Sequence, residues 1–152
     1  MCGIFGLITK PGKEISPEST KKILKNIAES SESRGKDSSG MAFRNLNKQT
    51  IDVIKGDVSI RDLLKSKEFN TCLNENLTSE NLSNGFVAFG HARLVTNGSQ
   101  LQQVNNQPVI KGDSLCIHNG IITNADEIWN TNKELKREYL IDTEIIPTLL
   151  TR

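Results

Sequence analysis

The feature that most constrains this chain is a short apolar run at its very beginning. Residues 2–8 are mostly apolar, and Pro11 and Gly12 close the run with a tight turn. This pattern predicts a buried β-strand that starts almost at the first residue. The N-terminus is therefore expected to lie inside the fold.

Strand and helix patterns follow one another along the rest of the chain. Ser16 and Pro17 are typical of a helix start, and apolar residues recur from there at helical spacing until Ser30. Residues 70–84 are dominated by Asn, Ser, Thr and Glu, which predicts an exposed loop. The other expected elements are a hairpin of 41–43 and 50–54, short strands at 86–89 and 115–117, and helices at 59–65 and 125–139, the last capped by Asn124. Together these patterns predict an α+β fold with a largely antiparallel sheet.

Composition excludes several classes of protein. With 152 residues, 36% of them hydrophobic and 24% charged, the chain can bury one ordinary core, so residues 1–152 are treated as one domain. The net charge of +1 provides no electrostatic basis for binding nucleic acid or an anionic membrane. Three cysteines are too few for a disulfide framework, and the odd number favours a reducing compartment, which predicts a cytoplasmic protein.

Cys2 is the most informative position for chemistry. An aminopeptidase removes Met1 when the second residue is small, which would leave Cys2 with both a thiol and a free α-amine. The amine has an ordinary pKa of about 8 and the thiol one of about 8.5, so the amine can take the thiol proton without a histidine. The alternative is that Cys2 is a small hydrophobic residue in a core strand.

Six short motifs, each ordinary alone, occur in the order typical of one enzyme family. They are MCGIFG (1–6), RGKDSSG (34–40), GHARLVTNG (90–98), NQP (106–108), HNGII (118–122) and DTE (142–144). In this order they resemble the class II glutamine amidotransferases, which are N-terminal-nucleophile (Ntn) hydrolases. The resemblance implies a four-layer α-β-β-α sandwich with antiparallel sheets. It also implies hydrolysis of the L-glutamine side-chain amide to glutamate and ammonia through a thioester on Cys2.

The resemblance also assigns roles to the residues that would bind and activate glutamine. Arg93, with a hydroxyl bond from Thr96, would hold the substrate α-carboxylate, because a guanidinium fits a planar carboxylate with two prongs. Asp142 would hold the α-ammonium. The side-chain amide of Asn119 and the N–H of Gly120 would form the oxyanion hole.

Other interpretations of these residues stay open at this point. Arg34, Gly35 and Asp37 would shape the site beside the nucleophile, although a serine-rich Arg-Gly loop is also typical of a simple turn. Arg93 alone could be a solvated surface charge. Asp142 could be a helix N-cap, a role compatible with substrate binding.

A zinc site is a weaker alternative. Cys116 and His118 alternate along one expected strand, and His91 and Cys2 could complete a cluster. A Cys-x-His pair lacks the usual spacing of structural zinc ligands, and such a cluster would consume the nucleophile. No metal or cofactor is therefore expected.

Departures from the family pattern leave the branch open. Leu94 and Asn97 stand where the glucosamine-6-phosphate synthase branch typically has Trp and His, and Gln107 stands where that branch has His. Leu94 and Gln107 are closer to the asparagine synthetase branch, and Gln-Pro also recurs in the amidophosphoribosyltransferase branch. The DSSG and HNGII segments are closest to the glucosamine branch.

The length of the chain raises a further expectation. The family's glutaminase domain continues with strands beyond the Asp142 motif, so the sandwich is expected to be C-terminally truncated here, and unpaired strand edges would favour association with another chain. Ammonia would pass to an acceptor domain or subunit outside this chain. Two other functions remain open: a related N-terminal-cysteine amidohydrolase acting on another γ-glutamyl or amide substrate, and a truncated, non-catalytic binding module.

Overall fold

Four antiparallel strands form the main sheet of the protein. The computed structural model describes residues 2–12, 15–94 and 101–151. The strands are arranged in the order β1-β4-β2-β3. Their bounds are β1 Gly3–Ile8, β2 Ser38–Asn45, β3 Thr50–Gly56 and β4 Val87–Arg93. The predicted first strand and the predicted hairpin are confirmed, and the strand expected at 86–89 extends to Arg93.

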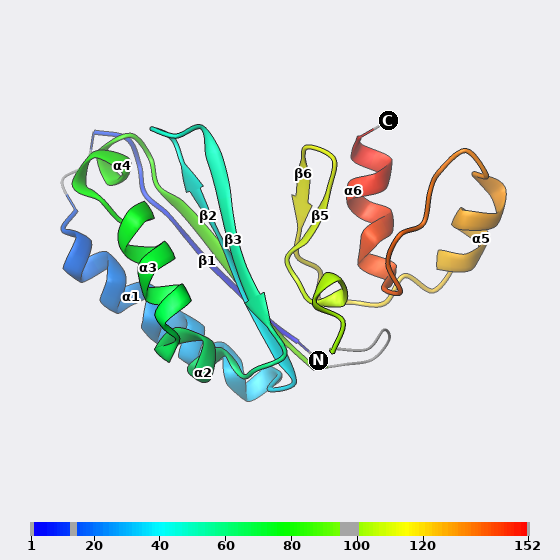
Figure 1. The fold of residues 1–152 in the computed structure, drawn as a ribbon, viewed down its shortest axis with the longest axis horizontal. Helices are drawn as coiled ribbons and strands as arrows, with labels where there is room; N and C mark the ends of the chain where they lie inside the picture. The colour runs from blue at the N-terminus through cyan, green and yellow to red at the C-terminus, as the bar shows by residue number, and fades with distance from the viewer. Residues whose placement is uncertain (1, 13–14, 95–100, 152) are drawn as a thin grey trace.

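Four helices cover one face of this sheet (Figure 1). They are α1 Pro17–Ser31, α2 Ile60–Lys65, α3 Lys67–Asn76 and α4 Ser79–Ser83, and a 3-10 turn, η1 Glu32–Arg34, follows α1. The predicted start of α1 is confirmed, since Pro17 is its first residue and the Ser16 side chain accepts a hydrogen bond from the Ser19 N–H. The helix predicted at 59–65 is confirmed as α2, with Ser59 as its N-cap.

Three phenylalanines from three elements meet in the core between these helices and the sheet. Phe43 of β2, Phe69 of α3 and Phe86 are fully buried. The ring centroid of Phe43 lies 6.1 Å from that of Phe69 and 6.4 Å from that of Phe86, both in tilted arrangements. Burial of these large rings stabilises the sheet on the side away from the candidate site described below.

The expectation of an exposed loop at 70–84 is wrong, because this polar segment forms most of α3 and all of α4. Leu73 and Leu77 follow Phe69 at intervals of four residues, which places all three side chains on one buried helix face. Asn81 is also buried, and its side-chain amide accepts from the Leu46 N–H at 3.0 Å and donates to the Asn76 carbonyl at 2.8 Å. The asparagines that suggested a loop therefore include buried structural residues.

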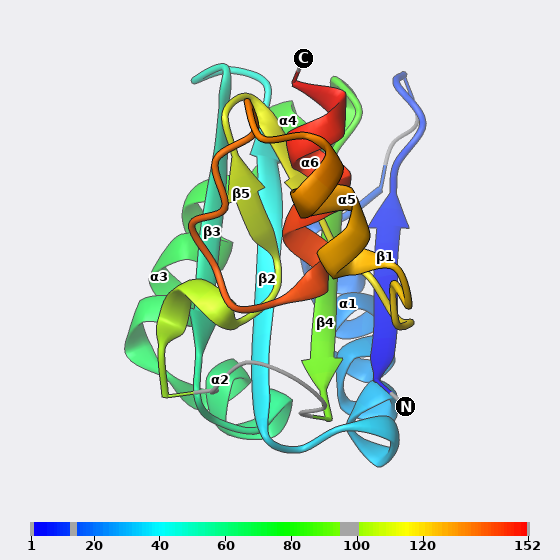
Figure 2. The ribbon, with the colours of Figure 1, turned by 90° about the vertical axis from the view of Figure 1, so that its right-hand side faces the viewer.

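Residues beyond 101 form a second, smaller layer facing the open side of the main sheet (Figure 1). Its elements are η2 Gln103–Asn105, β5 Val109–Lys111, β6 Ser114–Cys116, α5 Ala125–Thr131, η3 Asp142–Glu144 and α6 Ile145–Leu150. Strands β5 and β6 pair as an antiparallel hairpin, and the strand predicted at 115–117 is confirmed as β6. Helix α6 contacts both of these strands, and Figure 2 shows α5 and α6 on the outer side of the layer. The α+β class with antiparallel sheets is confirmed.

The helix expected at 125–139 is wrong in length, since α5 ends at Thr131. The N–H groups of Glu138 and Tyr139 donate to the Glu144 carboxylate at 2.8 Å each, so a tertiary contact replaces the helical bonds of this segment. Asn124 precedes α5, but its side chain makes no capping hydrogen bond. Within the described residues, no helix is both long enough and apolar enough to cross a membrane.

Candidate active site around Cys2

Cys2 directly precedes β1, and its thiol lies against the end of β4. Gly3 pairs with Ala92 across the two strands, so Cys2 is brought to the last residues of β4. The Leu94 N–H donates to the Cys2 sulfur at 3.3 Å, and the thiol contacts the Leu94 carbonyl at 3.4 Å. The half-buried sulfur is thus held by polar backbone atoms, in contrast to a cysteine packed among core side chains.

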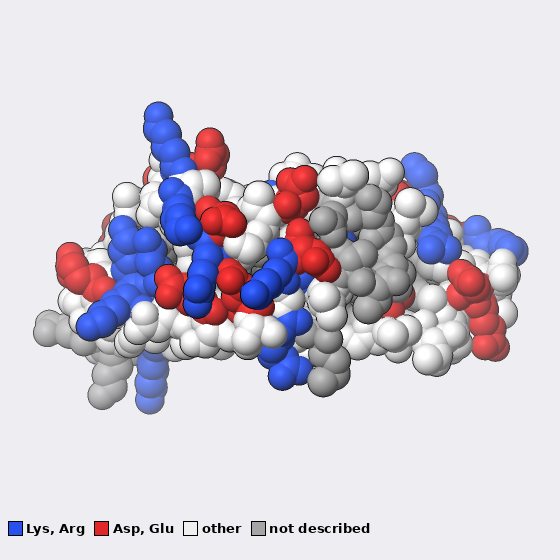
Figure 3. Space-filling view, turned by 90° about the horizontal axis from the view of Figure 1, so that it is seen from below, with Lys and Arg blue, Asp and Glu red and all other residues white. Residues whose placement is uncertain are grey.

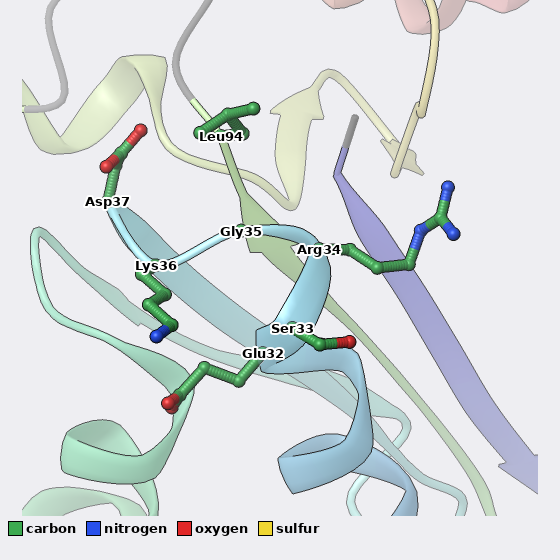
Figure 4. Close-up of a pocket in the computed structure, with 7 residues that line it drawn as sticks. All are labelled: Glu32, Ser33, Arg34, Gly35, Lys36, Asp37 and Leu94. Carbon is green, nitrogen blue, oxygen red and sulfur yellow. The ribbon is translucent and has the colours of Figure 1, made fainter.

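Arg34 links the end of α1 to the nucleophile candidate. Its Nε donates to the Cys2 carbonyl at 3.1 Å, and Figure 4 shows its side chain turned toward β1. The loop that contains Arg34 borders a cavity of about 600 Å³ beside Leu94 (Figure 4). The residues lining this cavity are Glu32, Ser33, Arg34, Gly35, Lys36, Asp37 and Leu94.

Gly35 allows the same loop to lie directly on the end of β4. A Cβ at this position would stand 2.6 Å from both the Ala92 carbonyl and the Leu94 nitrogen, distances that real side chains do not reach. Two residues later, the Asp37 N–H donates to the Arg93 carbonyl at 3.0 Å. The absence of a side chain at Gly35 therefore brings the Asp37 backbone onto the residue expected to bind substrate.

Arg93 is almost fully buried, with 4% of its surface exposed. Its Nη1 donates to the Asn105 carbonyl at 2.8 Å and to the Asn106 Oδ1 at 3.0 Å. A buried guanidinium with fixed partners is a rigid, directed group. The alternative of a solvated surface charge is therefore wrong.

Acidic groups lie near the Arg93 guanidinium. Burial lowers the pKa of Arg93, while Asp37, Asp142 and the ionised form of Cys2 act to raise it. Cys2 and Asp37 belong to the main sheet and its loops, whereas Asp142 belongs to the second layer. Acidic groups of both layers therefore lie near Arg93.

Asp142 is 8% exposed and is the first residue of η3. Its Oδ2 accepts a hydrogen bond from the Ile122 N–H at 2.8 Å. The interpretation of Asp142 as a helix N-cap is wrong, because Ile141 occupies that position and no side chain caps the turn. The carboxylate instead binds the backbone N–H of the last residue of the HNGII motif.

The expected oxyanion residues follow His118 on an exposed segment after β6. The His118 carbonyl lies 3.2 Å from His91 Nε2 and accepts from Gln107 Nε2 at 3.0 Å, while the His118 N–H donates to Gln107 Oε1 at 2.6 Å. Asn119 and Gly120 are both exposed. They are therefore anchored to β4 and to the 105–108 segment through the residue that precedes them.

His91 is neutral at ordinary pH. Burial lowers its pKa to about 4, the positive charge of Arg93 contributes in the same direction, and the hydrogen bond to His118 opposes the shift. With His118 O as acceptor, Nε2 carries the proton. Within the described part of the chain, Nδ1 is buried without a hydrogen-bond partner.

Sequence reasoning missed the importance of residues 105–108. The NQP motif contributed to the family resemblance without receiving a role, and this was the one signal for it. In the structure Asn105 and Asn106 hold Arg93, and Gln107 holds His118.

Lys55 of β3 donates to the carbonyls of Asn106 and Pro108, and burial lowers the pKa of Lys55 to about 8.

Thr96, one of the two residues expected to hold the substrate α-carboxylate, lies outside the described residues. Residues 2–12, 15–94 and 101–151 contain no group of three or more His, Cys, Asp or Glu side chains arranged to hold a metal ion. On the face viewed in Figure 3, basic and acidic side chains are interleaved.

The chain is similar over nearly its whole length to a class of glutamine-using aminotransferases. These relatives are glutamine–fructose-6-phosphate aminotransferases (isomerizing). The one from Clostridium perfringens is 31% identical over 155 residues, covering 99% of this chain and 22% of that protein. Those from Shouchella clausii and Geobacillus kaustophilus are 33% and 31% identical, covering 95% and 100% of this chain and 20% and 22% of the relatives. No protein-family model matches the chain.

These similarities support a class II glutamine amidotransferase domain and an enzyme of that kind. They give no support for the asparagine synthetase branch. The chain spans about a fifth of the length of the relatives it matches.

Proposed function

We propose that this chain performs the glutaminase half-reaction of a class II glutamine amidotransferase, with Cys2 as nucleophile. The observation that carries the proposal is the position of the Cys2 thiol, 3.3 Å from the Leu94 nitrogen and next to the buried Arg93. The opposite charges of Asp37 and Asp142 face the same guanidinium. A zwitterionic amino acid requires such a pair of opposite charges near the nucleophile.

The reaction begins once Met1 has been removed and the Cys2 α-amine is free. The amine takes the thiol proton, and the sulfur attacks the carbonyl carbon of the glutamine side-chain amide. The tetrahedral intermediate collapses when the C–N bond breaks, the amine returns its proton to the leaving nitrogen, and ammonia departs. Water then hydrolyses the thioester, which gives glutamate and restores the thiol.

The other proposed roles follow from the chemistry of the substrate. Arg93, together with Thr96, binds the α-carboxylate, and Asp142 binds the α-ammonium. Asn119 and the Gly120 N–H donate to the amide oxygen as it becomes an oxyanion, where one donor is worth about 3 kcal/mol of barrier in comparable enzymes. Arg34, Gly35 and Asp37 shape the site, which is supported by their contacts with Cys2, Leu94 and Arg93.

The layers of the molecule support a fold of the Ntn-hydrolase type. Helices, the four-stranded sheet, the two-stranded sheet and α6 with α5 follow one another across Figure 1, an order compatible with an α-β-β-α sandwich. The ammonia is proposed to pass to an acceptor in a domain or subunit outside residues 1–152. The relatives suggest the glucosamine-6-phosphate synthase branch.

The test is to express the chain, measure its intact mass, and assay release of glutamate from L-glutamine. We expect the mass to show loss of Met1, and Cys2→Ala to abolish release, because no other thiol lies beside the α-amine. The matched controls are Cys72→Ala and Cys116→Ala, since both cysteines are also half-buried. Both controls should keep the wild-type rate.

Two results would contradict the proposal. Retention of Met1 in active protein would remove the α-amine as the base. Full activity of Cys2→Ala would remove the nucleophile itself.

A further inference from the structure

The side-chain amide of Gln107 binds both backbone groups of a single residue. Its Oε1 accepts from the His118 N–H at 2.6 Å, and its Nε2 donates to the His118 carbonyl at 3.0 Å. Two bonds to the N–H and C=O of one residue reproduce the pairing between strands of an antiparallel sheet. The peptide groups on both sides of His118 are thereby fixed in position and in direction.

Gln107 is itself held firmly enough to act as an anchor. It is 6% exposed, and its Nε2 also donates to the buried Thr143 Oγ1 at 3.2 Å. Lys55 Nζ donates to the carbonyls of the residues before and after Gln107, at 2.8 and 2.9 Å. Because Gln107 itself is buried, losing one of the bonds of its side chain leaves a buried polar group unpaired.

The anchored residue leads directly into the proposed oxyanion donors. Asn119 and Gly120 follow His118 and are exposed, and none of the described residues forms a hydrogen bond with the Asn119 side chain. The direction of both donors therefore depends on the His118 peptide. His91 is the second group that holds this peptide, with Nε2 at 3.2 Å from the His118 carbonyl.

We propose that Gln107 is a positioning residue that aims the Asn119 amide and the Gly120 N–H at the developing oxyanion. This inference rests on the proposed glutaminase function. Oxyanion donors act mainly in the transition state, so a misdirected pair lowers kcat more than it changes KM. A glutamine suits this task because its amide presents a donor and an acceptor side by side.

The first test is Gln107→Met, which keeps the length of the side chain and removes both hydrogen bonds. We expect kcat for glutamate release to fall about 10- to 100-fold, a part of the loss that removal of an oxyanion donor causes, with KM changed by less than about threefold. Thr143→Val is the matched control, because it removes only the contact with Thr143. It should retain most of the wild-type kcat.

Gln107→Glu provides a readout that a purely structural residue would not give. A carboxylate cannot donate to the His118 carbonyl, but a protonated carboxyl group has one donor and one acceptor and can restore both bonds. The ratio of the variant kcat to the wild-type kcat should therefore rise as the pH is lowered. If Gln107→Met melts below the assay temperature, this variant carries the test.

A double-mutant cycle with Asn119→Ala separates positioning from general stability. If Gln107 acts through the oxyanion donors, Gln107→Met should cost several-fold less in the Asn119→Ala background than in wild type. An equal loss in both backgrounds, or a raised KM with unchanged kcat, would overturn the inference. Hydrogen exchange at the His118 amide, expected to be faster in Gln107→Met, checks the pairing without reference to activity.

The outcomes distinguish this inference from the proposed function. A wild-type chain that releases no glutamate would overturn both. An active wild-type chain whose Gln107 variants keep full kcat would overturn the inference alone and leave Cys2 chemistry intact.

Discussion

Residues 2–94 and residues 101–151 are held together by different kinds of contact. The first region has an apolar cluster packed between the sheet and its helices, with the rings of Phe43, Phe69 and Phe86 near its centre. In the second region buried polar residues outnumber buried apolar ones. The polar residues are Asn105, Asn106, Gln107, Asp142, Thr143, Glu144 and Thr148, and the apolar ones are Pro108, Val109, Trp129, Ile141, Ile145 and Pro147.

This difference indicates that the two regions contribute differently to the candidate site. Apolar burial has no preferred direction and mainly stabilises the fold, whereas buried hydrogen bonds are directional and fix geometry. Cys2 and Arg93 come from the first region, while Asn119 and Asp142 come from the second. The proposed nucleophile thus lies on the stable layer, and the groups that would activate the substrate lie on the layer held by polar contacts.

The largest expected effect is loss of the aromatic cluster. Phe43→Ala removes a fully buried ring, and we expect the free energy of unfolding to fall by about 3–5 kcal/mol in denaturant titrations. The control is Ile51→Ala on the neighbouring strand, where the side chain is exposed and the change should stay within about 0.5 kcal/mol. Similar effects of the two changes would mean that the apolar cluster does not dominate the first region.

The next effect tests the polar contacts of the second region. Lys111 Nζ lies 2.6 Å from an oxygen of the fully buried Glu144. Burial alone would lower the pKa of Lys111, but the hydrogen bond and charge of Glu144 outweigh it, so the pKa is raised. Lys111→Met leaves the Glu144 carboxylate without its cation, and we expect a loss of about 3 kcal/mol in the free energy of unfolding.

An exposed ion pair of the first region provides the control for this prediction. Lys48 and Glu75 lie 3.2 Å apart, and more than half of each side chain is exposed. Lys48→Met should change the free energy of unfolding by less than about 1 kcal/mol. Equal losses for the two lysine variants would show that the Lys111 pair is no more than a surface contact.

The smallest expected effect is the loss of stability in acid caused by His91, which lies at the contact between the two regions. The pKa of His91 is about 4 in the folded protein and ordinarily 6.5, so between these values the unfolded chain binds more protons and stability falls as the pH is lowered. We expect His91 to contribute a loss of about 2 kcal/mol between about pH 7 and pH 5. His91→Gln, which cannot titrate, should lack this part of the acid sensitivity, and an identical pH profile for both proteins would contradict the burial of a neutral His91.

Sequence patterns predicted the main sheet well and parts of the helical layer poorly. The first strand, the hairpin and α1 follow from apolar spacing and local caps, which act over a few residues. The polar composition of 70–84 hid the four-residue spacing of Leu73 and Leu77 behind Phe69. The length of α5 could not be predicted, because the Glu144 carboxylate binds backbone groups five and six residues before it.

The candidate site was also predictable only in part. Cys2, Arg93, Asn119 and Asp142 were selected from the sequence because their motifs occur in a family's order, and the structure places Cys2 and Asp142 near Arg93. The anchoring role of Gln107 could not be predicted, because its partner is the backbone of an irregular segment 11 residues away. Backbone N–H and C=O groups are common to nearly all residue types, so the type of residue that provides them does not reveal the contact.

The sequence by itself determined the α+β class, the strands of the main sheet and the residue types available for the chemistry at Cys2. These features depend on local backbone preferences and on the spacing of apolar side chains, and both are set by residues that are close together in the sequence. Only the tertiary structure decided that Arg93 is buried between Asn105 and Asn106, and that Gln107 fixes His118. Directional hydrogen bonds between distant segments exist only once packing has excluded water and placed both partners, so no local pattern encodes them.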